Sequence, residues 1–319
     1  MTILLDPTIL FFIFGIFAGL VKSNLEIPQP ISRFLSLYLL MALGLKGGFA
    51  LNKSGFAPEI AISLGLAITL AIAIPLLSYN LLKQRLDKLD AAAIAATYGS
   101  ISAVTFITTV QVLDQVGISY GGHMAAAMAL MESPAIIIAI ILANRNRQQR
   151  SSNKSGHTPL GKVLHESFTD GGQLLLLGAL VVGLISGEAG QKVMAPFSID
   201  LFKGLLAFFL LDMGLLAAKS LGELKGKPTI TLAYAFIAPP CHAMIALSLC
   251  HLLNIPLGDT ILLMILAASA SYIAVPAVLR HAMPEVSPAM YMGTSLGITF
   301  PLNIIVGIPI YIAIAKYFV

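Results

Sequence analysis

The sequence predicts an all-α polytopic membrane protein with ten transmembrane helices in a five-plus-five inverted repeat. Three observations predict this fold class. The 319-residue chain is 57% hydrophobic and only 11% charged, whereas a soluble domain is about a quarter charged. Its apolar residues form separate runs, many of them close to the ~20 residues that a helix needs to cross a bilayer. The two halves of the chain also carry similar features at matching places.

Ten apolar runs are long enough to be read as spans. The first has no basic residue before it, so we interpret it as a retained span and not as a secretory signal. The expected spans are residues 4–21, 31–50, 57–82, 91–112, 121–143, 172–188, 200–218, 229–253, 259–279 and 288–316.

The longest polar connection divides these spans into two groups of five. It runs from Asn144 to Asp170. We therefore expect a first five-helix repeat (1–145), a cytoplasmic linker (146–170) and a second repeat (171–319). Because five is an odd number of crossings, the second copy must insert upside down, as in many secondary transporters.

Short matching segments support the repeat. Residues 41–45 (MALGL) resemble residues 211–215 (LDMGL), which pairs Gly44 with Gly214. Pro134 in the fifth span pairs in the same way with Pro301 in the tenth.

The basic residues predict the orientation. With the linker in the cytoplasm, 14 of the 19 Lys and Arg residues fall on the cytoplasmic side, and the opposite orientation would invert this ratio. We therefore predict a multi-pass protein of the plasma (inner) membrane with both termini external, on the periplasmic side. The net charge of +4 comes mostly from these flanking loops, and it gives no reason to expect nucleic-acid binding.

Two spans are expected to be broken helices. Residues 267–276 (AASASYIAVP) lie inside an apolar run, and Pro276 cannot donate a backbone hydrogen bond, so the helix should break or kink just before it. Residues 96–105 (ATYGSISAVT) occupy the matching place in the first half, where Ser100 aligns with Ser271. Paired interrupted spans of this kind indicate a transporter binding site at the membrane midplane, so the two non-helical turns should lie in contact.

The breaks supply the candidate site. The N–H groups of a downstream half-helix suit an anion, and the C=O groups of an upstream half-helix suit a cation such as sodium. The alternative is that small residues and serines only allow close helix packing. The candidate substrate-binding residues are Ser100, Ser102, Ala103, Val104, Thr105, Ser271, Tyr272, Ile273, Ala274 and Val275, and the candidate cation-binding residues at the breaks are Gly99, Ser102, Thr105, Ser269 and Ser271.

Two acidic residues within spans complete the cation candidates. Asp212 lies in the middle of the seventh span, where a charge is costly and by default functional. Glu132 lies just before Pro134 in the fifth span. For each, the alternative is a structural carboxyl, hydrogen bonded within the protein or to backbone freed by the proline.

Neither catalysis nor a metal centre is expected. The sequence has no P-loop, no GxGxxG and no nucleophile–base constellation. The two cysteines, Cys241 and Cys250, imply neither a disulfide framework nor a metal site.

At these residues the chain resembles the sodium-dependent bicarbonate transporter family of cyanobacteria and other bacteria. The resemblance runs over nearly the whole length and is densest in residues 99–144 and 267–311, for example at Pro276, Tyr291 and Pro301. It implies an elevator-type transporter whose broken fourth and ninth spans cross in a mobile core. It also implies a homotrimer, bicarbonate import with Na⁺ as the coupling ion, and inhibition by a PII-like cytoplasmic regulatory protein.

The chain departs from the family pattern at the breaks. The family's first break reads Ser-Gly-Ser-Thr, and here residues 102–105 read Ser-Ala-Val-Thr. The family's second break reads Ser-Ser-Ser-Asp-Ile-Ser-Gly-Pro, and here residues 269–276 read Ser-Ala-Ser-Tyr-Ile-Ala-Val-Pro. Tyr272 thus replaces an acid, hydroxyls are replaced by Val104, Ala270 and Ala274, and Glu132 stands where the family has Asp.

The leading interpretation is a secondary transporter that imports a small anion, bicarbonate first, with sodium. A second interpretation is a divergent paralogue that carries another organic anion, because the site has become less polar. A third, from a different class, is a non-transporting membrane sensor or partner-binding homologue.

The orientation can be tested at Ser152 in the linker. A single cysteine placed there by Ser152→Cys should resist an impermeant thiol reagent added outside intact cells and react once the membrane is opened. The basic linker places this position in the cytoplasm. Labelling from outside would reverse the whole assignment.

Overall fold

The computed structural model describes residues 5–55, 58–150, 161, 165, 169–224 and 226–319. The chain is 84% helix, and the described residues contain no strand, which confirms the all-α prediction. Most of the expected linker lies outside the described residues. The helix before it continues to Arg150, a few residues into the segment assigned to the linker.

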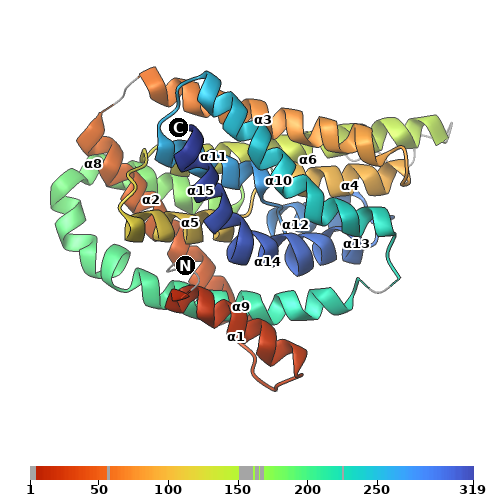
Figure 1. The fold of residues 1–319 in the computed structure, drawn as a ribbon, viewed down its shortest axis with the longest axis horizontal. Coiled ribbons are helices and arrows are strands. Elements are labelled where there is room, and N and C mark those ends of the chain that lie inside the picture. The colour runs from red at the N-terminus through yellow and green to blue at the C-terminus, as the bar shows by residue number, and fades with distance from the viewer. Residues whose placement is uncertain (1–4, 56–57, 151–160, 162–164, 166–168, 225) are drawn as a thin grey trace.

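The described residues of the first half form six helices (Figure 1). They are α1 (Pro7–Leu20), α2 (Gln29–Ser54), α3 (Pro58–Leu82), α4 (Lys88–Gly99), α5 (Ala103–Val116) and α6 (Met124–Arg150). Local signals set their ends: Asp6 and Asp87 cap α1 and α4 by accepting backbone N–H bonds, and Gly117 ends α5 in a left-handed conformation with φ 70°.

The described part of the second half also consists of helices, and its last span is more irregular. Its helices are α8 (Gly171–Ala195), η2 (Pro196–Asp200), α9 (Phe202–Gly222), α10 (Thr229–Leu252), α11 (Leu257–Ala268), α12 (Ala274–Ala282), α13 (Pro288–Met292), η3 (Gly293–Thr299), α14 (Phe300–Leu302), η4 (Asn303–Gly307) and α15 (Ile308–Phe318). The η segments are π-helical. No loop separates α8 from α9, and the chain turns at Gly187, whose φ of 55° is non-helical.

Seven helical stretches in the described residues are long and apolar enough to cross a membrane. Four of the ten expected spans are not separate members of this group. The first is the shorter helix α1, the ninth is divided between α11 and α12, and the sixth and seventh form one continuous stretch, Gly171–Gly222. The structure therefore supports a multi-pass membrane protein, and the ten-span topology stays a prediction.

The helices form two groups. In one group α1 packs along α9 and α2 packs along α8. In the other, α3, α4 and α6 pack together, and α10 packs on α11 and on the last span. Figure 1 shows α1 and α9 along one side of the molecule and α3, α6 and α10 along the other.

Glycines allow the backbones of the first group to approach closely. A Cβ on Gly214 of α9 would lie 2.3 Å from the carbonyl oxygen of Phe12 in α1. A Cβ on Gly44 of α2 would lie 2.4 Å from the carbonyl oxygen of Leu176 in α8. Small residues at such contacts are typical of helix packing in membranes.

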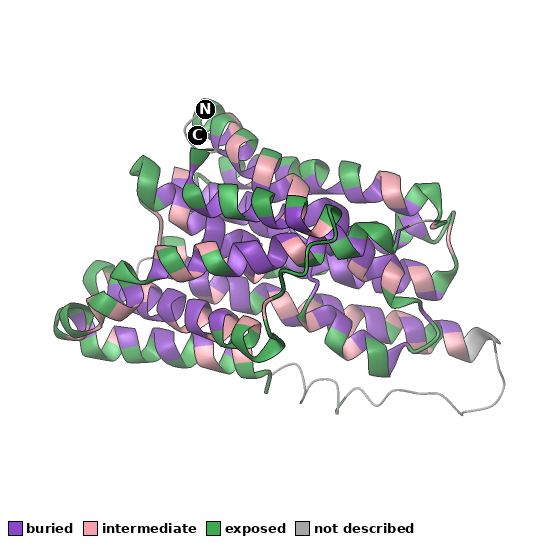
Figure 2. Cartoon of the chain, turned by 90° about the horizontal axis from the view of Figure 1, so that it is seen from below, coloured by how far each residue is buried: buried purple, intermediate pink, exposed green. Residues whose placement is uncertain are grey.

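Burial follows the pattern of a protein that faces lipid. Figure 2 shows the buried residues concentrated between the helices and the exposed ones on their outer sides. Many exposed residues are large and apolar, among them Phe17, Leu77 and Ile237. A soluble monomer rarely exposes so much apolar surface, so these outer faces are suited to the hydrocarbon of a bilayer.

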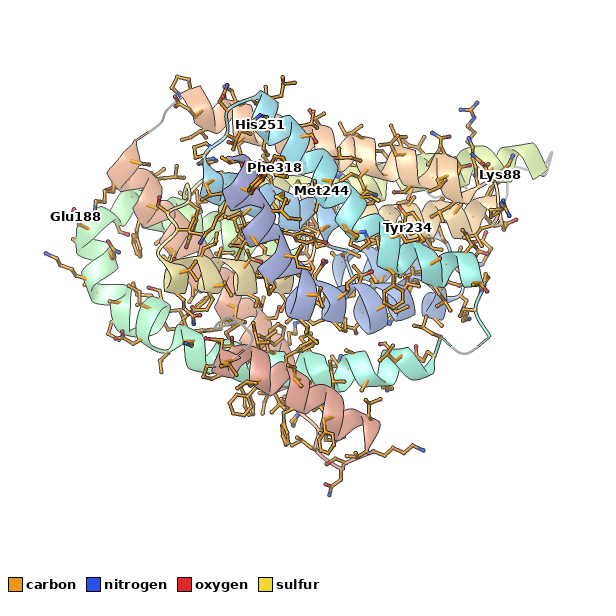
Figure 3. All side chains as sticks on the ribbon, in the orientation of Figure 1. Lys88, Glu188, Tyr234, Met244, His251 and Phe318 are labelled. Atoms are coloured by element: carbon orange, nitrogen blue, oxygen red, sulfur yellow. The ribbon has the colours of Figure 1, made fainter. Side chains whose placement is uncertain are left out.

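The two ends of the molecule's long axis differ in the residues they carry. Figure 3 shows Glu188 at one end and Lys88 at the other. At the Lys88 end the α6 residue Arg147 forms two hydrogen bonds with Glu285, at 3.0 and 2.8 Å, in the segment between α12 and α13. Lys227 reaches Ser287 in the same segment at 3.3 Å. Basic residues from both halves thus meet near one short segment.

The close approach of α1 and α9 should make Gly214 intolerant of a side chain. We expect Gly214→Ala to lower stability by about 1–3 kcal/mol because the new methyl overlaps the α1 backbone. Gly204→Ala is the matched control in α9, since a Cβ there meets nothing within 4 Å. Thermal unfolding in detergent measures both variants, and equal midpoints for the two would contradict the packing interpretation.

Candidate functional site

Two spans are interrupted, as the sequence predicts. α4 ends at Gly99 and α5 begins at Ala103, while α11 ends at Ala268 and α12 begins at Ala274. The second break lies a little earlier than expected. Pro276 is not at its edge but in the first turn of α12, where the missing N–H has no intrahelical partner to lose.

The two breaks lie in direct contact, which confirms that prediction. The backbone N–H of Ser271 donates to the Thr97 carbonyl oxygen at 2.8 Å. The backbone N–H of Ser102 donates to Ser269 Oγ at 3.0 Å. The C-terminal ends of α4 and α11 and the N-terminal ends of α5 and α12 therefore meet at one place, which we call the junction (residues 97–105 and 266–275).

Several junction hydroxyls satisfy the interrupted backbone. Ser102 Oγ caps α5 by accepting the Thr105 N–H at 3.2 Å and the Thr105 hydroxyl at 2.9 Å. Ser269 Oγ donates to the Leu266 carbonyl oxygen at 2.9 Å. Ser271 Oγ accepts the Val275 N–H at 3.2 Å. Each of these hydroxyl groups thus has a structural role, as buried polar groups require.

The remaining substrate candidates differ in placement. Val104 and Val275 are buried, Ala103 and Ala274 are half-buried, and Ile273 is 54% exposed. The side chain of Ile273 therefore lies away from the buried part of the junction.

Tyr272 is the most unusual member of the junction. Its side chain is buried, and its ring centroid lies 5.1 Å from that of Phe300. Its hydroxyl has no hydrogen-bond partner within bonding geometry among the described residues, although the Ser102 hydroxyl is close enough to interact with it. A buried phenol without a partner is costly, so this hydroxyl is available to a bound molecule.

Gly99 has a packing role. A Cβ on Gly99 would lie 2.6 Å from the ring of Pro75, so a glycine lets α4 approach helix α3 at this proline. Ser100, which follows it, donates through Oγ to the Glu132 carbonyl oxygen at 3.2 Å.

The two acidic candidates lie outside the hydrogen-bonded centre of the junction. The half-buried side chain of Glu132 interacts with Gln173 of α8, and its hydrogen bond to the junction is made by the backbone carbonyl oxygen. Asp212 of α9 is buried and accepts a hydrogen bond from the Ser32 hydroxyl of α2, although it is near enough to Tyr272 for an electrostatic interaction. The structural alternative for Asp212 gains support from this bond.

Asn303 was not selected from the sequence, and it also lies at the junction. Its side chain is fully buried, and Nδ2 donates to the carbonyl oxygen of Ala268 at 2.8 Å. Its Oδ1 has no hydrogen-bond partner among the described residues. The sequence does contain a feature that marks Asn303 as a candidate, because it is an amide in a strongly apolar span, two residues after Pro301. It opens the π-helical segment η4, and π-helical turns occur often at functional sites.

The chemistry of the junction suits small ions. The described residues contain no group of three or more His, Cys, Asp and Glu side chains arranged to hold a metal ion. The oxygen atoms that could coordinate a cation at the junction belong to hydroxyl and carbonyl groups and to the side-chain amide of Asn303. Unwound carbonyls and helix C-terminal ends coordinate sodium in other transporters, and helix N-terminal ends favour anions.

Comparison with protein families identifies one match over almost the whole chain. The Na⁺-dependent bicarbonate transporter superfamily matches residues 7–316. Comparison with curated proteins gave no match.

The contact between the breaks predicts a cost for Ser269→Ala. This change removes the acceptor of the Ser102 N–H and should destabilise the protein by about 1–3 kcal/mol, because a buried donor is left unpaired. The matched control is Ser248→Ala, whose exposed hydroxyl bonds only a carbonyl of its own helix at 2.9 Å. The measurement is thermal unfolding followed by far-ultraviolet circular dichroism. A Ser269→Ala midpoint no lower than that of Ser248→Ala would count against the bridge.

Proposed function

Because the chain belongs to the Na⁺-dependent bicarbonate transporter superfamily, we propose that it is a secondary transporter that imports a small anion, bicarbonate first, with sodium. One structural observation supports this proposal independently of the family match. Four helix ends from two broken spans meet at one buried junction. Such a junction offers partial charges of both signs without a fixed charged side chain.

The anion is expected at the N-terminal ends of α5 and α12. Ser102, Thr105 and Ser271 lie at or just before these ends, and Ser100 caps the C-terminal end of α4 beside them. The unpaired Tyr272 hydroxyl can donate one hydrogen bond to an anion oxygen. Bicarbonate is small and carries several acceptor oxygens, so a few hydroxyl and backbone donors suffice for it.

The sodium ion is expected at the C-terminal ends of α4 and α11. The oxygen ligands available to sodium are of three kinds. They are carbonyl oxygens near Gly99 and Ala268, the hydroxyls of Ser102 and Ser269, and the unpaired Oδ1 of Asn303. Glu132 and Asp212 stay secondary candidates, because their side chains contact α8 and α2.

An inverted repeat of residues 1–145 and 171–319 is supported by equivalent contacts. Gly44 in the second expected span lies against the sixth, and its repeat partner Gly214 in the seventh lies against the first. The repeat pairs α1 with α8 and α2 with α9. The contact of α1 with α9 therefore corresponds to the contact of α8 with α2.

The two helix groups suggest how transport proceeds. We expect α1, α2, α8 and α9 to act as a scaffold and the group that contains the junction to move against it, elevator fashion. Both termini would face the outside, and the Lys88 end, with Arg147 and Lys227, would face the cytoplasm. A homotrimer in the inner membrane and a PII-like regulator at the cytoplasmic end are further expectations from the family.

A second candidate substrate is another organic anion. Val104, Ala270 and Ala274 give the junction an apolar character, and the Tyr272 and Phe300 rings lie side by side. Such surfaces favour an anion with an apolar part. Uptake into proteoliposomes of bicarbonate and of a series of short carboxylates separates these substrates, and uptake of none of them would favour the sensor interpretation.

The replacement of an acid by Tyr272 makes sodium coupling testable. We expect uptake by the native protein to fall about tenfold when choline replaces sodium, which corresponds to about 1.4 kcal/mol of coupling through backbone and hydroxyl donors. Tyr272→Asp tests whether a carboxylate strengthens the coupling, and Tyr272→Phe is the control that keeps the ring against Phe300.

The outcomes of this series are distinct. Equal uptake in sodium and choline by the native protein would reject the expected coupling. Sodium dependence that appears only in Tyr272→Asp would show that the tyrosine in place of the family's acid had removed the coupling site.

A further inference from the structure

A cavity of about 260 Å³ lies between α2, α5 and the segment that leads into α6. Its floor is formed by buried apolar residues, including Leu43, Phe106 and Val110. Its mouth is formed by exposed positions, including Ala50 and Asp114. Phe106 lies one residue after Thr105 of the junction, so α5 carries residues of both the cavity and the candidate site.

Two donors converge on one carboxylate at this mouth. Lys46 Nζ of α2 lies 3.2 Å from Asp114 Oδ2 of α5. The Tyr120 hydroxyl donates to Asp114 Oδ1 at 3.0 Å. Lys46 Nζ also lies 4.5 Å from the centre of the Phe202 ring, which adds a cation–π contact to the ion pair.

Tyr120 is suited to remain a donor. Burial, followed by the nearby Asp114 carboxylate, raises the pKa of the Tyr120 hydroxyl far above its ordinary value. The group is therefore protonated at any physiological pH and offers its hydrogen to an anion.

We propose that Lys46 and Tyr120 form a binding subsite for a small oxyanion, and that the Asp114 carboxylate occupies this subsite as a tethered substitute. A carboxylate has the same planar pair of oxygens as bicarbonate or formate. An incoming anion of this class takes the place of Asp114, which turns outward into solvent. The inference rests on the proposed anion transport, for which the subsite is the first binding step on the route to the junction.

The exposure of Asp114 makes this exchange feasible. Its side chain is 39% exposed, and exposed ion pairs contribute little to stability. Asp114 can therefore leave Lys46 without stranding a buried charge.

A nearby carboxylate provides the contrast. Asp6 is 7% exposed, and it is bonded by Lys203 at 3.0 Å and by Gln115 at 2.6 Å. These residues do not line the cavity. Asp6 caps α1, so its role is structural and its partner Lys203 serves as a control cation.

The test measures anion binding without transport. In purified protein with Cys241 and Cys250 replaced by alanine, Ala50→Cys places one thiol at the mouth of the cavity. The rate of its modification by an anionic thiol reagent is measured against increasing formate or bicarbonate, with gluconate as the large-anion control. We expect formate and bicarbonate to protect the thiol and gluconate to leave it reactive.

Three variants decide the proposal. Asp114→Asn should lower the half-protecting formate concentration by about 3–10-fold, because the subsite no longer has an internal competitor. Lys46→Gln should abolish protection, and Lys203→Gln should leave it unchanged. An unchanged or higher half-protecting concentration in Asp114→Asn would overturn the proposal and leave an ordinary ion pair. Protection that survives Lys46→Gln would overturn it as well.

Flux measurements separate this inference from the proposed function. Tighter protection in Asp114→Asn, in a protein that transports none of the anions, would support the subsite and reject transport. Flux of bicarbonate in the native protein with no protection of the thiol would support transport and reject the subsite.

Discussion

The structure depends on one constraint, that a backbone interrupted inside a membrane must find hydrogen-bond partners within the protein. The two broken spans meet this constraint through each other. Ser271 donates to the carbonyl of Thr97, and Ser102 donates to the hydroxyl of Ser269. Neither break is completed by its own half of the chain. The contact that creates a candidate ion site is therefore also the contact that makes the fold tolerable in lipid.

This dual role explains why the hydroxyls of the junction support two interpretations. Ser102, Ser269 and Ser271 already bond the backbone, so they cannot be assigned to ligands from their type alone. The groups that have no hydrogen-bond partner among the described residues are more informative. Tyr272 and Asn303 place an unpaired hydroxyl and an unpaired amide oxygen in buried positions at the junction. A buried polar group without a protein partner is open to a bound ion or water.

Much of the fold was predictable from the sequence, because composition and hydropathy act along the chain. The all-α class, the two interrupted spans and the contact between them followed from apolar runs and from the repeat that aligns Ser100 with Ser271. Other features depend on tertiary contacts. The side chain of Glu132 faces Gln173, Asp212 binds Ser32, and Ile273 points away from the junction, and none of these directions is encoded by local pattern. Asn303 was overlooked because its partner, Ala268, lies in a different span.

The bond between Ser102 and Ser269 joins residues that are 167 positions apart in the chain. At about 5–20 residues per second, a ribosome needs roughly 10–30 s to synthesise that interval. During this time the first broken span has left the ribosome, while the residue that completes it has not yet been made. Helices α1 to α6 are therefore inserted as an unfinished unit, with an unpaired backbone donor at the first break. Biogenesis of this protein requires that the insertion machinery, or water held within it, shelter the first break until α11 and Ser269 arrive.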